Sequence, residues 1–171
     1  PPAPSRPCPP LANDLHLISP FPDAGSYSEG AAVNCSICAA GTSSSGRASA
    51  CVKCESGKYS DEDGSSECTK CEVGTWSNTS AASCSSCAPG TYSGAGAEAC
   101  TDCDAGKFSG AAATSCTSCG AGKFQNATGA TSCRECPRGR AQAVTGEDAC
   151  VPSDPGTYMA DTGETGCLRC S

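Results

Sequence analysis

A single apolar position recurs along this chain, set among small and polar residues. After each of a series of cysteines come a glycine, an aromatic residue two places later and, in most copies, a serine, followed by a polar stretch that ends at another cysteine. This order of glycine, a few extended residues and a polar turn predicts two short strands joined by a turn. Each copy is therefore a minimal β-hairpin, and we expect little helix apart from a turn around residues 11–18.

Alignment on the cysteines gives a repeat of 16 or 17 residues that runs almost without interruption through residues 35–150. The glycines of its seven loops are Gly41, Gly57, Gly74, Gly90, Gly106, Gly122 and Gly139. The aromatic positions hold Tyr59, Trp76, Tyr92, Phe108 and Phe124, with Ser43 and Ala141 in the first and last loops. Tyr27 and Tyr158 hold the same position in two degenerate copies that flank the array.

The repeats divide the chain into three predicted regions. Residues 1–34 form a proline-rich extended arm with a degenerate first repeat, residues 35–150 the tandem repeats, and residues 151–171 a degenerate terminal repeat in which Ser153 replaces an opening cysteine. The prolines favour polyproline II geometry in the arm. The arm could be a spacer, a docking strand or a site of proline hydroxylation and O-glycosylation, and the sequence does not choose among these roles.

Composition makes cysteine the residue on which folding depends. The chain has 18 cysteines in 171 residues, and only 5% of its residues are aromatic. So small an apolar content cannot offset the entropy of ordering the backbone, which costs on the order of 1 kcal/mol per residue. The fold must therefore be secured by disulfides or by metal. The formal charge of −7 and the scattered basic residues make nucleic acid and anionic membranes poor partners, and no apolar stretch approaches the length of a membrane span.

These features predict a small, disulfide-rich, elongated tandem array of short β-hairpin loops. We expect the aromatic side chain to pack over a disulfide or against the neighbouring repeat, where the glycine leaves room. Contacts would then join adjacent repeats only, as in a solenoid.

The strings CAPGTYSGAGAEACTDC and CDAGKFSGAAATSCTSC follow the pattern C-x2-G-x-[YF]-S-x6-C-x2-C. This pattern resembles the ephrin-receptor-like cysteine-rich repeat of extracellular proteins and is similar to the cysteine-rich repeats of tumour necrosis factor receptors. The resemblance covers residues 35–150 and implies that the second cysteine of each C-x2-C closes on the first cysteine of the next. The implied disulfides are Cys8–Cys35, Cys38–Cys51, Cys54–Cys68, Cys71–Cys84, Cys87–Cys100, Cys103–Cys116, Cys119–Cys133 and Cys136–Cys150.

Two cysteines are left over at the C-terminal end, Cys167 and Cys170. We expect them to bond to each other, because they are close in sequence. Cys170 could instead open a further loop, or either thiol could bond to another subunit. Repeated C-x2-C pairs are also compatible with four-cysteine zinc sites, but the continuous array and the extracellular resemblance favour disulfides, and the sequence implies no metal and no cofactor.

Three N-glycosylation sequons begin at Asn34, Asn78 and Asn126. The last two fall in the turn half of a loop, clear of the disulfides, whereas Asn34 abuts Cys35 and is the weakest candidate. His16, the one histidine, lies among aliphatic residues and is interpreted as a packing or surface residue. The acidic run at residues 61–63 lacks the remainder of a calcium loop and is interpreted as a solvated turn. No catalytic motif is present, and the chain is not expected to be an enzyme.

Two functional classes remain. The first is a structural subunit of a secreted or cell-surface glycoprotein fibre, coat or stalk that assembles with copies of itself or with other extracellular proteins. The second is the ectodomain of a cell-surface receptor or adhesin that binds a protein ligand. The abundance of small polar residues favours the first class, because binding hot spots are enriched in Trp, Tyr and Arg, and the aromatic residues here already serve the repeat.

Overall fold

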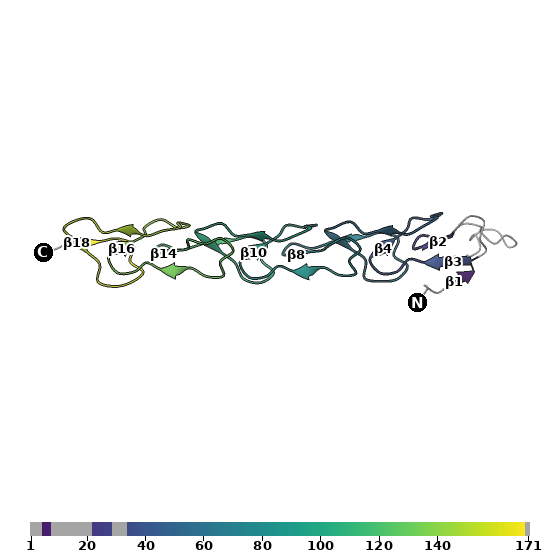
Figure 1. Ribbon diagram of the computed structural model, residues 1–171, viewed down its shortest axis with the longest axis horizontal. Helices are drawn as coiled ribbons and strands as arrows, with labels where there is room; N and C mark the ends of the chain where they lie inside the picture. The colour runs from purple at the N-terminus through teal and green to yellow at the C-terminus, as the bar shows by residue number, and fades with distance from the viewer. Residues whose placement is uncertain (1–4, 8–21, 29–33, 170–171) are drawn as a thin grey trace. The chain divides into compact units, whose positions relative to one another are not determined.

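The structure, a computed structural model, describes residues 5–7, 22–28 and 34–169. These residues form short antiparallel β-hairpins and no helix (Figure 1). The predicted array of tandem, disulfide-closed hairpins is confirmed, while the turn predicted at residues 11–18 lies outside the described residues. The strands are β1 (Ser5–Pro7), β2 (Ser26–Tyr27), β3 (Asn34–Ile37), β4 (Thr42–Ser43), β5 (Val52–Lys53), β6 (Lys58–Tyr59), β7 (Thr69–Lys70), β8 (Thr75–Trp76), β9 (Ser85–Ser86), β10 (Thr91–Tyr92), β11 (Thr101–Asp102), β12 (Lys107–Phe108), β13 (Thr117–Ser118), β14 (Lys123–Phe124), β15 (Arg134–Glu135), β16 (Arg140–Ala141), β17 (Val151–Pro152), β18 (Thr157–Tyr158) and β19 (Leu168–Arg169).

Each complete hairpin forms within one repeat, and the pair β4–β5 illustrates how. The turn before β4 is closed by a hydrogen bond of 3.0 Å from the Thr42 N–H to the Ala39 carbonyl. The third residue of this turn, Gly41, has a φ of +82°, a conformation that favours glycine. A two-residue ladder is too short to persist alone, so the Cys38–Cys51 disulfide is needed to hold its ends together. The later hairpins pair β6 with β7, β8 with β9, β10 with β11, β12 with β13, β14 with β15, β16 with β17 and β18 with β19.

The N-terminal arm supplies a third strand to the first hairpin. β3 pairs with β2 on one edge and with β1 on the other, and Pro7 lies opposite Asn34. Residues 5–7 of the proline-rich arm are therefore an edge strand of this sheet. The remainder of the arm, including Cys8 and His16, lies outside the described residues.

We number the complete repeats 1 to 7 by their opening residues. These residues are Cys38, Cys54, Cys71, Cys87, Cys103, Cys119 and Cys136. The degenerate N-terminal repeat opens at Pro22, and the degenerate C-terminal repeat opens at Ser153.

The loop of each repeat docks on the repeat before it through one residue, which we call the repeat tip. In repeat 3 the tip is Ser80, which has a φ of 60° and donates its N–H to the carbonyl of Cys54 at 2.8 Å. Every tip likewise has positive φ and donates to the residue that opens the preceding repeat. The tips are Arg47, Gly64, Ser80, Gly96, Ala112, Gly129, Gly146 and Gly163.

The turn glycine packs against the tip that lies two repeats further along the chain. A Cβ atom added to Gly57 would overlap the backbone carbonyl of Gly96, and one added to Gly90 would overlap that of Gly129. The same overlap occurs at Gly25, Gly41, Gly74, Gly106 and Gly122. The prediction that only adjacent repeats touch is therefore wrong. The room at the glycine is filled by a backbone carbonyl instead of an aromatic ring.

The interior of the repeats is small and polar. The opening cysteines of repeats 1 to 7 are exposed by 1% or less. The serine after the aromatic position is also buried and donates its hydroxyl to the preceding repeat, as from Ser93 Oγ to the Thr75 carbonyl at 3.0 Å. The serines with this bond are Ser44, Ser60, Ser77, Ser93 and Ser109. The repeat aromatics are only half-buried or, for Tyr158, exposed, so they border this interior instead of forming it.

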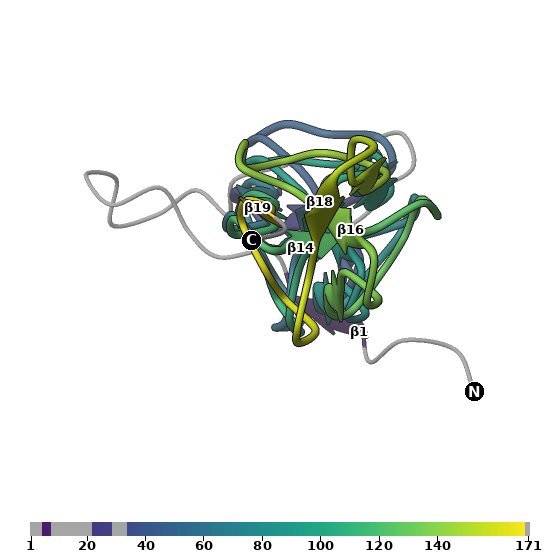
Figure 2. The ribbon, with the colours of Figure 1, turned by 90° about the vertical axis from the view of Figure 1, so that its left-hand side faces the viewer.

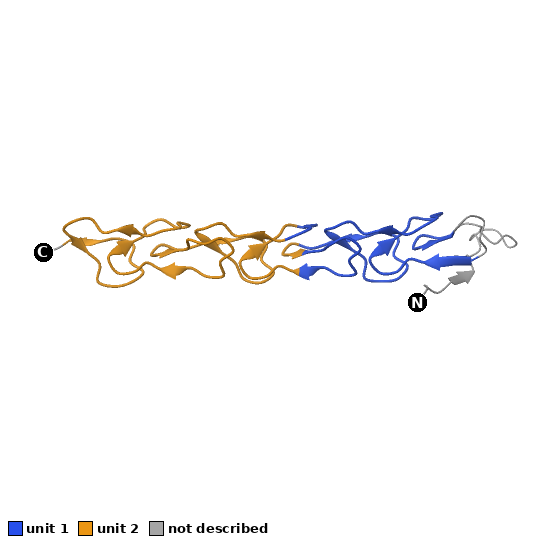
Figure 3. Ribbon diagram, in the orientation of Figure 1, with its two compact units in different colours: residues 1–72, 76–85, 95–99 blue, residues 73–75, 86–94, 100–171 orange. Residues whose placement is uncertain are grey.

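The chain separates into two compact units whose sequences interleave (Figure 3). Unit 1 comprises residues 1–72, 76–85 and 95–99, and unit 2 comprises residues 73–75, 86–94 and 100–171. The segments 76–85 and 95–99 carry the tips of repeats 3 and 4. These tips belong to unit 1 because they dock backwards on repeats of that unit.

Three glycines of unit 2 allow the effect of the packed carbonyl on stability to be distinguished from the effect of a positive φ. Gly106 combines a φ of +82° with the packed carbonyl of Gly146, Gly139 has a φ of +80° with open space around it, and Gly110 has neither feature. We expect Gly139→Ala to cost about 1–2 kcal/mol of unfolding free energy through its conformation alone. Gly106→Ala should cost more, because the tip of repeat 7 must also move, and Gly110→Ala should be nearly neutral.

Chemical denaturation of the oxidised variants measures these differences. Equal losses for Gly106→Ala and Gly139→Ala would show that the tip contact contributes nothing to stability.

Candidate interaction surface

Seven disulfides close the loops of repeats 1 to 7, with the pairing that the resemblance implies. They are Cys38–Cys51, Cys54–Cys68, Cys71–Cys84, Cys87–Cys100, Cys103–Cys116, Cys119–Cys133 and Cys136–Cys150. Cys35 is also disulfide-bonded, whereas Cys8, its expected partner, lies outside the described residues. Cysteines joined in this way are not available as thiolate ligands for zinc.

The predicted Cys167–Cys170 bond is wrong, because Cys167 is an exposed free thiol. Strand β19 follows Cys167 directly and pairs with β18. An extended chain rises about 3.3 Å per residue, so two cysteines on either side of a two-residue strand are generally farther apart than the 4.4–6.8 Å that the Cα atoms of a disulfide require. The same geometry places Cys51 and Cys54, on either side of β5, in different disulfides. The position that should hold the partner of Cys167 is Ser153.

The acidic run at residues 61–63 serves a contact between repeats. Asp63 Oδ1 accepts a hydrogen bond of 2.9 Å from the Ala40 N–H of repeat 1. Across residues 5–7, 22–28 and 34–169, no group of three or more His, Cys, Asp or Glu side chains is placed to hold a metal ion. The same residues contain no helix with the length and hydropathy of a membrane span.

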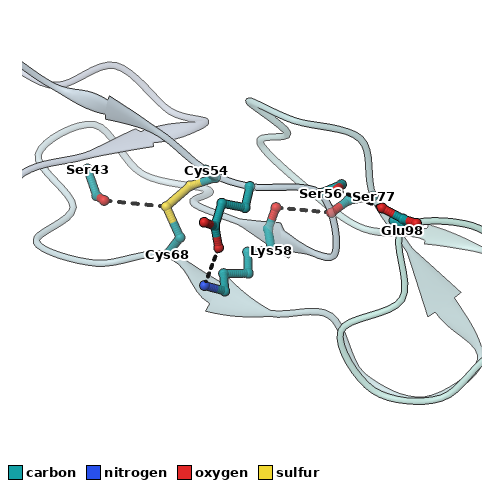
Figure 4. Close-up of polar contacts among 8 residues, drawn as sticks. Ser43, Cys54, Ser56, Lys58, Cys68, Ser77 and Glu98 are labelled. Carbon is teal, nitrogen blue, oxygen red and sulfur yellow. Dashed lines mark hydrogen bonds and ion pairs between the residues drawn. A yellow bond between two sulfur atoms is a disulfide. The ribbon is translucent and has the colours of Figure 1, made fainter.

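Polar side-chain contacts also join repeats of unit 1 (Figure 4). Ser77 donates its hydroxyl to the carbonyl of Lys58 at 3.0 Å, and Ser56 donates to Glu98 at 3.2 Å. The Lys58 ammonium donates to Glu55 at 2.8 Å, and this bond and charge hold the pKa of the Glu55 carboxyl below its ordinary value. Because Glu55 is exposed to solvent, this ion pair adds little to stability.

All three sequon asparagines are exposed. Asn78 and Asn126 lie in loops, each directly after a buried side chain, Ser77 or Gln125. Asn34 is the first residue of strand β3.

Among residues 22–28 and 34–169, most of the large apolar side chains that are exposed lie in repeat 7 and the C-terminal repeat. Val144, Val151, Tyr158 and Leu168 are exposed by 58%, 62%, 48% and 54%. These four residues belong to two consecutive repeats, and we use the name terminal patch for this set. Figure 2 views the ribbon from the end that carries strands β18 and β19. Tyr158 and Leu168 are paired opposite each other in this hairpin. Val52 in repeat 1 is similarly exposed and, like Val151, is the first residue after a closing cysteine. The terminal patch is the candidate site for recognition of a partner.

Sequence reasoning missed the roles of the buried serine and the repeat tip. The serine was visible as a residue that recurs after the aromatic position, which was a signal for a buried hydrogen bond. The tip gave no comparable signal, because its residue type varies between glycine, serine, alanine and arginine while its contacts use backbone atoms alone.

Comparison with known proteins gives a family match for part of the chain. Residues 106–149 match the family described as tyrosine-protein kinase ephrin type A/B receptor-like. This match confirms the resemblance to ephrin-receptor-like cysteine-rich repeats and does not extend it to tumour necrosis factor receptor repeats. No curated protein matches the chain. The ephrin-receptor-like repeat is a non-catalytic extracellular type of domain, and with the disulfides it indicates an extracellular chain.

Replacing Ser153 with cysteine tests whether Cys167 is a free thiol because its partner position holds serine. The separation of Ser153 from Cys167 equals the separation of 14 residues in the Cys136–Cys150 loop. We expect Ser153→Cys to form a disulfide with Cys167 and to stabilise the C-terminal repeat by about 3 kcal/mol in the chain-entropy model. Peptide mapping without reduction detects the bond.

Ser153→Ala is the matched control, and it should leave Cys167 reactive toward a thiol reagent. Recovery of Cys167 linked to Cys170 in the unmodified chain would contradict the structure.

Proposed function

We propose that this chain is a repeat region in the ectodomain of a cell-surface receptor or adhesin, and that the terminal patch binds a protein ligand. The observation that carries the proposal is the ephrin-receptor-like match at residues 106–149. This match favours a receptor-like role over the fibre or coat subunit that the composition suggested. The proposed role is recognition, without catalysis.

The proposal is supported by the contrast between the repeat positions used for packing and the side chains that stay exposed. The opening cysteine, the turn glycine and the buried serine are occupied by contacts between repeats, and the aromatic positions border the interior. The side chains that remain exposed are mostly small, and these contribute little to a binding hot spot. The terminal patch departs from this composition, since Tyr158 leaves the half-buried state of the other repeat aromatics and pairs with exposed Leu168.

Basic residues accompany the patch. Arg138 and Arg140 of repeat 7 are exposed, and Arg138 lies 3.5 Å from the carboxylate of Asp161 in the C-terminal repeat. Tyrosine and arginine are enriched in hot spots, because each combines a broad apolar surface with a polar end. The patch thus has the chemistry of a surface that binds protein.

The proposal is tested with the secreted, oxidised chain, presented in bivalent form to a panel of cell-surface and secreted proteins. For the ligand recovered, we expect Tyr158→Ala to lower the affinity by roughly tenfold or more, the size of a hot-spot effect. Val151→Ala should lower it less.

Val52→Ala is the matched control, since it removes an equally exposed valine at the same repeat position in unit 1. Equal loss of binding in Val52→Ala and Val151→Ala would contradict a ligand site at the terminal patch. Sedimentation of the chain as filaments, with no ligand recovered, would favour the structural subunit instead.

A further inference from the structure

Two sequons occupy the same place in the repeat. Asn78 of repeat 3 and Asn126 of repeat 6 each follow directly after the buried side chain that succeeds the aromatic position. In the other described repeats this place holds an exposed residue that is serine, aspartate, glycine or alanine. These residues are Ser45, Asp61, Gly94, Gly110, Ala143 and Ala160. The fold therefore imposes no requirement for asparagine at this position.

The side chains of Asn78 and Asn126 are free as well as exposed. In the described part of the chain neither amide has a hydrogen-bond partner, and the residue before each one turns its own side chain into the interior. A group attached to either amide nitrogen would project into solvent without displacing a packed atom. Surface loops of secreted proteins are where asparagine accepts carbohydrate.

Asn34 is held differently, although its side chain is exposed. Its backbone belongs to β3, where it lies opposite Pro7 of β1, and it directly precedes Cys35, which is 3% exposed and disulfide-bonded. This sequon is thus fixed in the centre of a three-stranded sheet and has no loop conformation to offer a transferase.

The remaining two sequons differ at their hydroxyl residue. In repeat 3 that residue is Ser80, the repeat tip, whose N–H is bonded to Cys54 and whose carbonyl packs against Gly41. In repeat 6 it is Thr128, which is exposed and precedes the tip Gly129. The longer loop of repeat 6, with a cysteine separation of 14 instead of 13, places the hydroxyl one residue outside the docked tip.

We propose that Asn126 and Asn78 are N-glycosylation sites of this chain, that Asn34 is not, and that Asn126 is the more completely occupied of the two. In the reaction the amide nitrogen of asparagine bonds to C1 of an oligosaccharide carried as a glycosyl diphosphate. The C1–O bond breaks, the diphosphate leaves with its electron pair, and the amide loses one proton. The transferase must reach the amide and the sequon hydroxyl together. The side chains of both sequons are exposed, but docking of repeat 3 fixes the backbone of Ser80, whereas the backbone of Thr128 lies outside the docked tip. Asn126 can therefore adapt its sequon to the transferase in the folded chain, and Asn78 can do so fully only before repeat 3 docks.

The test uses the full chain secreted from a eukaryotic cell that performs N-glycosylation. Release of the glycans by peptide N-glycosidase in heavy-oxygen water converts each occupied asparagine to labelled aspartate, and peptide mass spectrometry gives the occupancy of each site. We expect Asn126 to be occupied most completely, Asn78 less so, and Asn34 to be unmodified. Asn126→Gln should remove one oligosaccharide mass from the intact protein, and Asn34→Gln should leave the mass of attached carbohydrate unchanged.

Two glycine variants, each of which disturbs the packing of one repeat tip, test whether docking of Ser80 limits the glycosylation of Asn78. Gly41→Ala should loosen the docked Ser80 and raise the occupancy of Asn78, whereas Gly90→Ala, which disturbs the equivalent contact of Gly129, should leave Asn126 unchanged. Should either alanine variant fail to be secreted, the occupancies of the unmodified chain still decide the assignment. An unmodified Asn126, or an Asn34 occupied as fully as Asn126, overturns the proposal. Equal occupancy of Asn78 and Asn126 overturns the ranking.

Discussion

The docking of each repeat tip on the backbone of earlier repeats is the interaction on which the fold depends. The tip N–H bonds to the residue that opens the preceding repeat, and the tip carbonyl packs on the turn glycine two repeats back. Loop length varies by one residue between repeats, yet this contact is kept, because the tip shifts by one position, as from Ser80 in repeat 3 to Gly129 in repeat 6. The structure thus preserves a backbone geometry and tolerates changes in residue count.

Disulfides and buried hydrogen bonds replace the apolar core in this arrangement. Closing a loop of about 15 residues contributes roughly 3 kcal/mol in the chain-entropy model, by restricting the unfolded chain. It also fixes the loop from which the tip projects. The buried serine hydroxyls add bonds such as that from Ser109 to Thr91. A typical bond of this kind contributes about 0.5–1.5 kcal/mol, but loss of its partner leaves a buried polar group unsatisfied. The interior is therefore specific despite its small apolar area.

The cysteine spacing was enough to predict the hairpins, because each loop is closed locally and its turn carries a glycine such as Gly41. The contact between repeats two places apart was not predictable in the same way, since it joins backbone atoms that every residue possesses. The turn glycine did show that something approaches closely, but it did not show whether the neighbour is a ring or a carbonyl. Cys167 was paired with Cys170 because the two cysteines are close in sequence. The sequence could not show that the residues after Cys167 form the extended strand β19, which disfavours a bond between them.

The C-terminal repeat, which carries part of the candidate recognition surface, lacks several of the contacts that hold the other repeats together. In the C-terminal repeat Ser153 replaces the opening cysteine, Met159 replaces the buried serine, and Gly156 has open space around it. Tyr158 is 48% exposed, whereas the earlier repeat aromatics are half-buried. Complete repeats expose single valines such as Val52, whereas the hairpin β18–β19 exposes Tyr158 and Leu168 opposite each other. In our proposal a protein ligand is recognised at the repeat that lacks its opening cysteine, because the exposed pair Tyr158 and Leu168 of the terminal patch lies there.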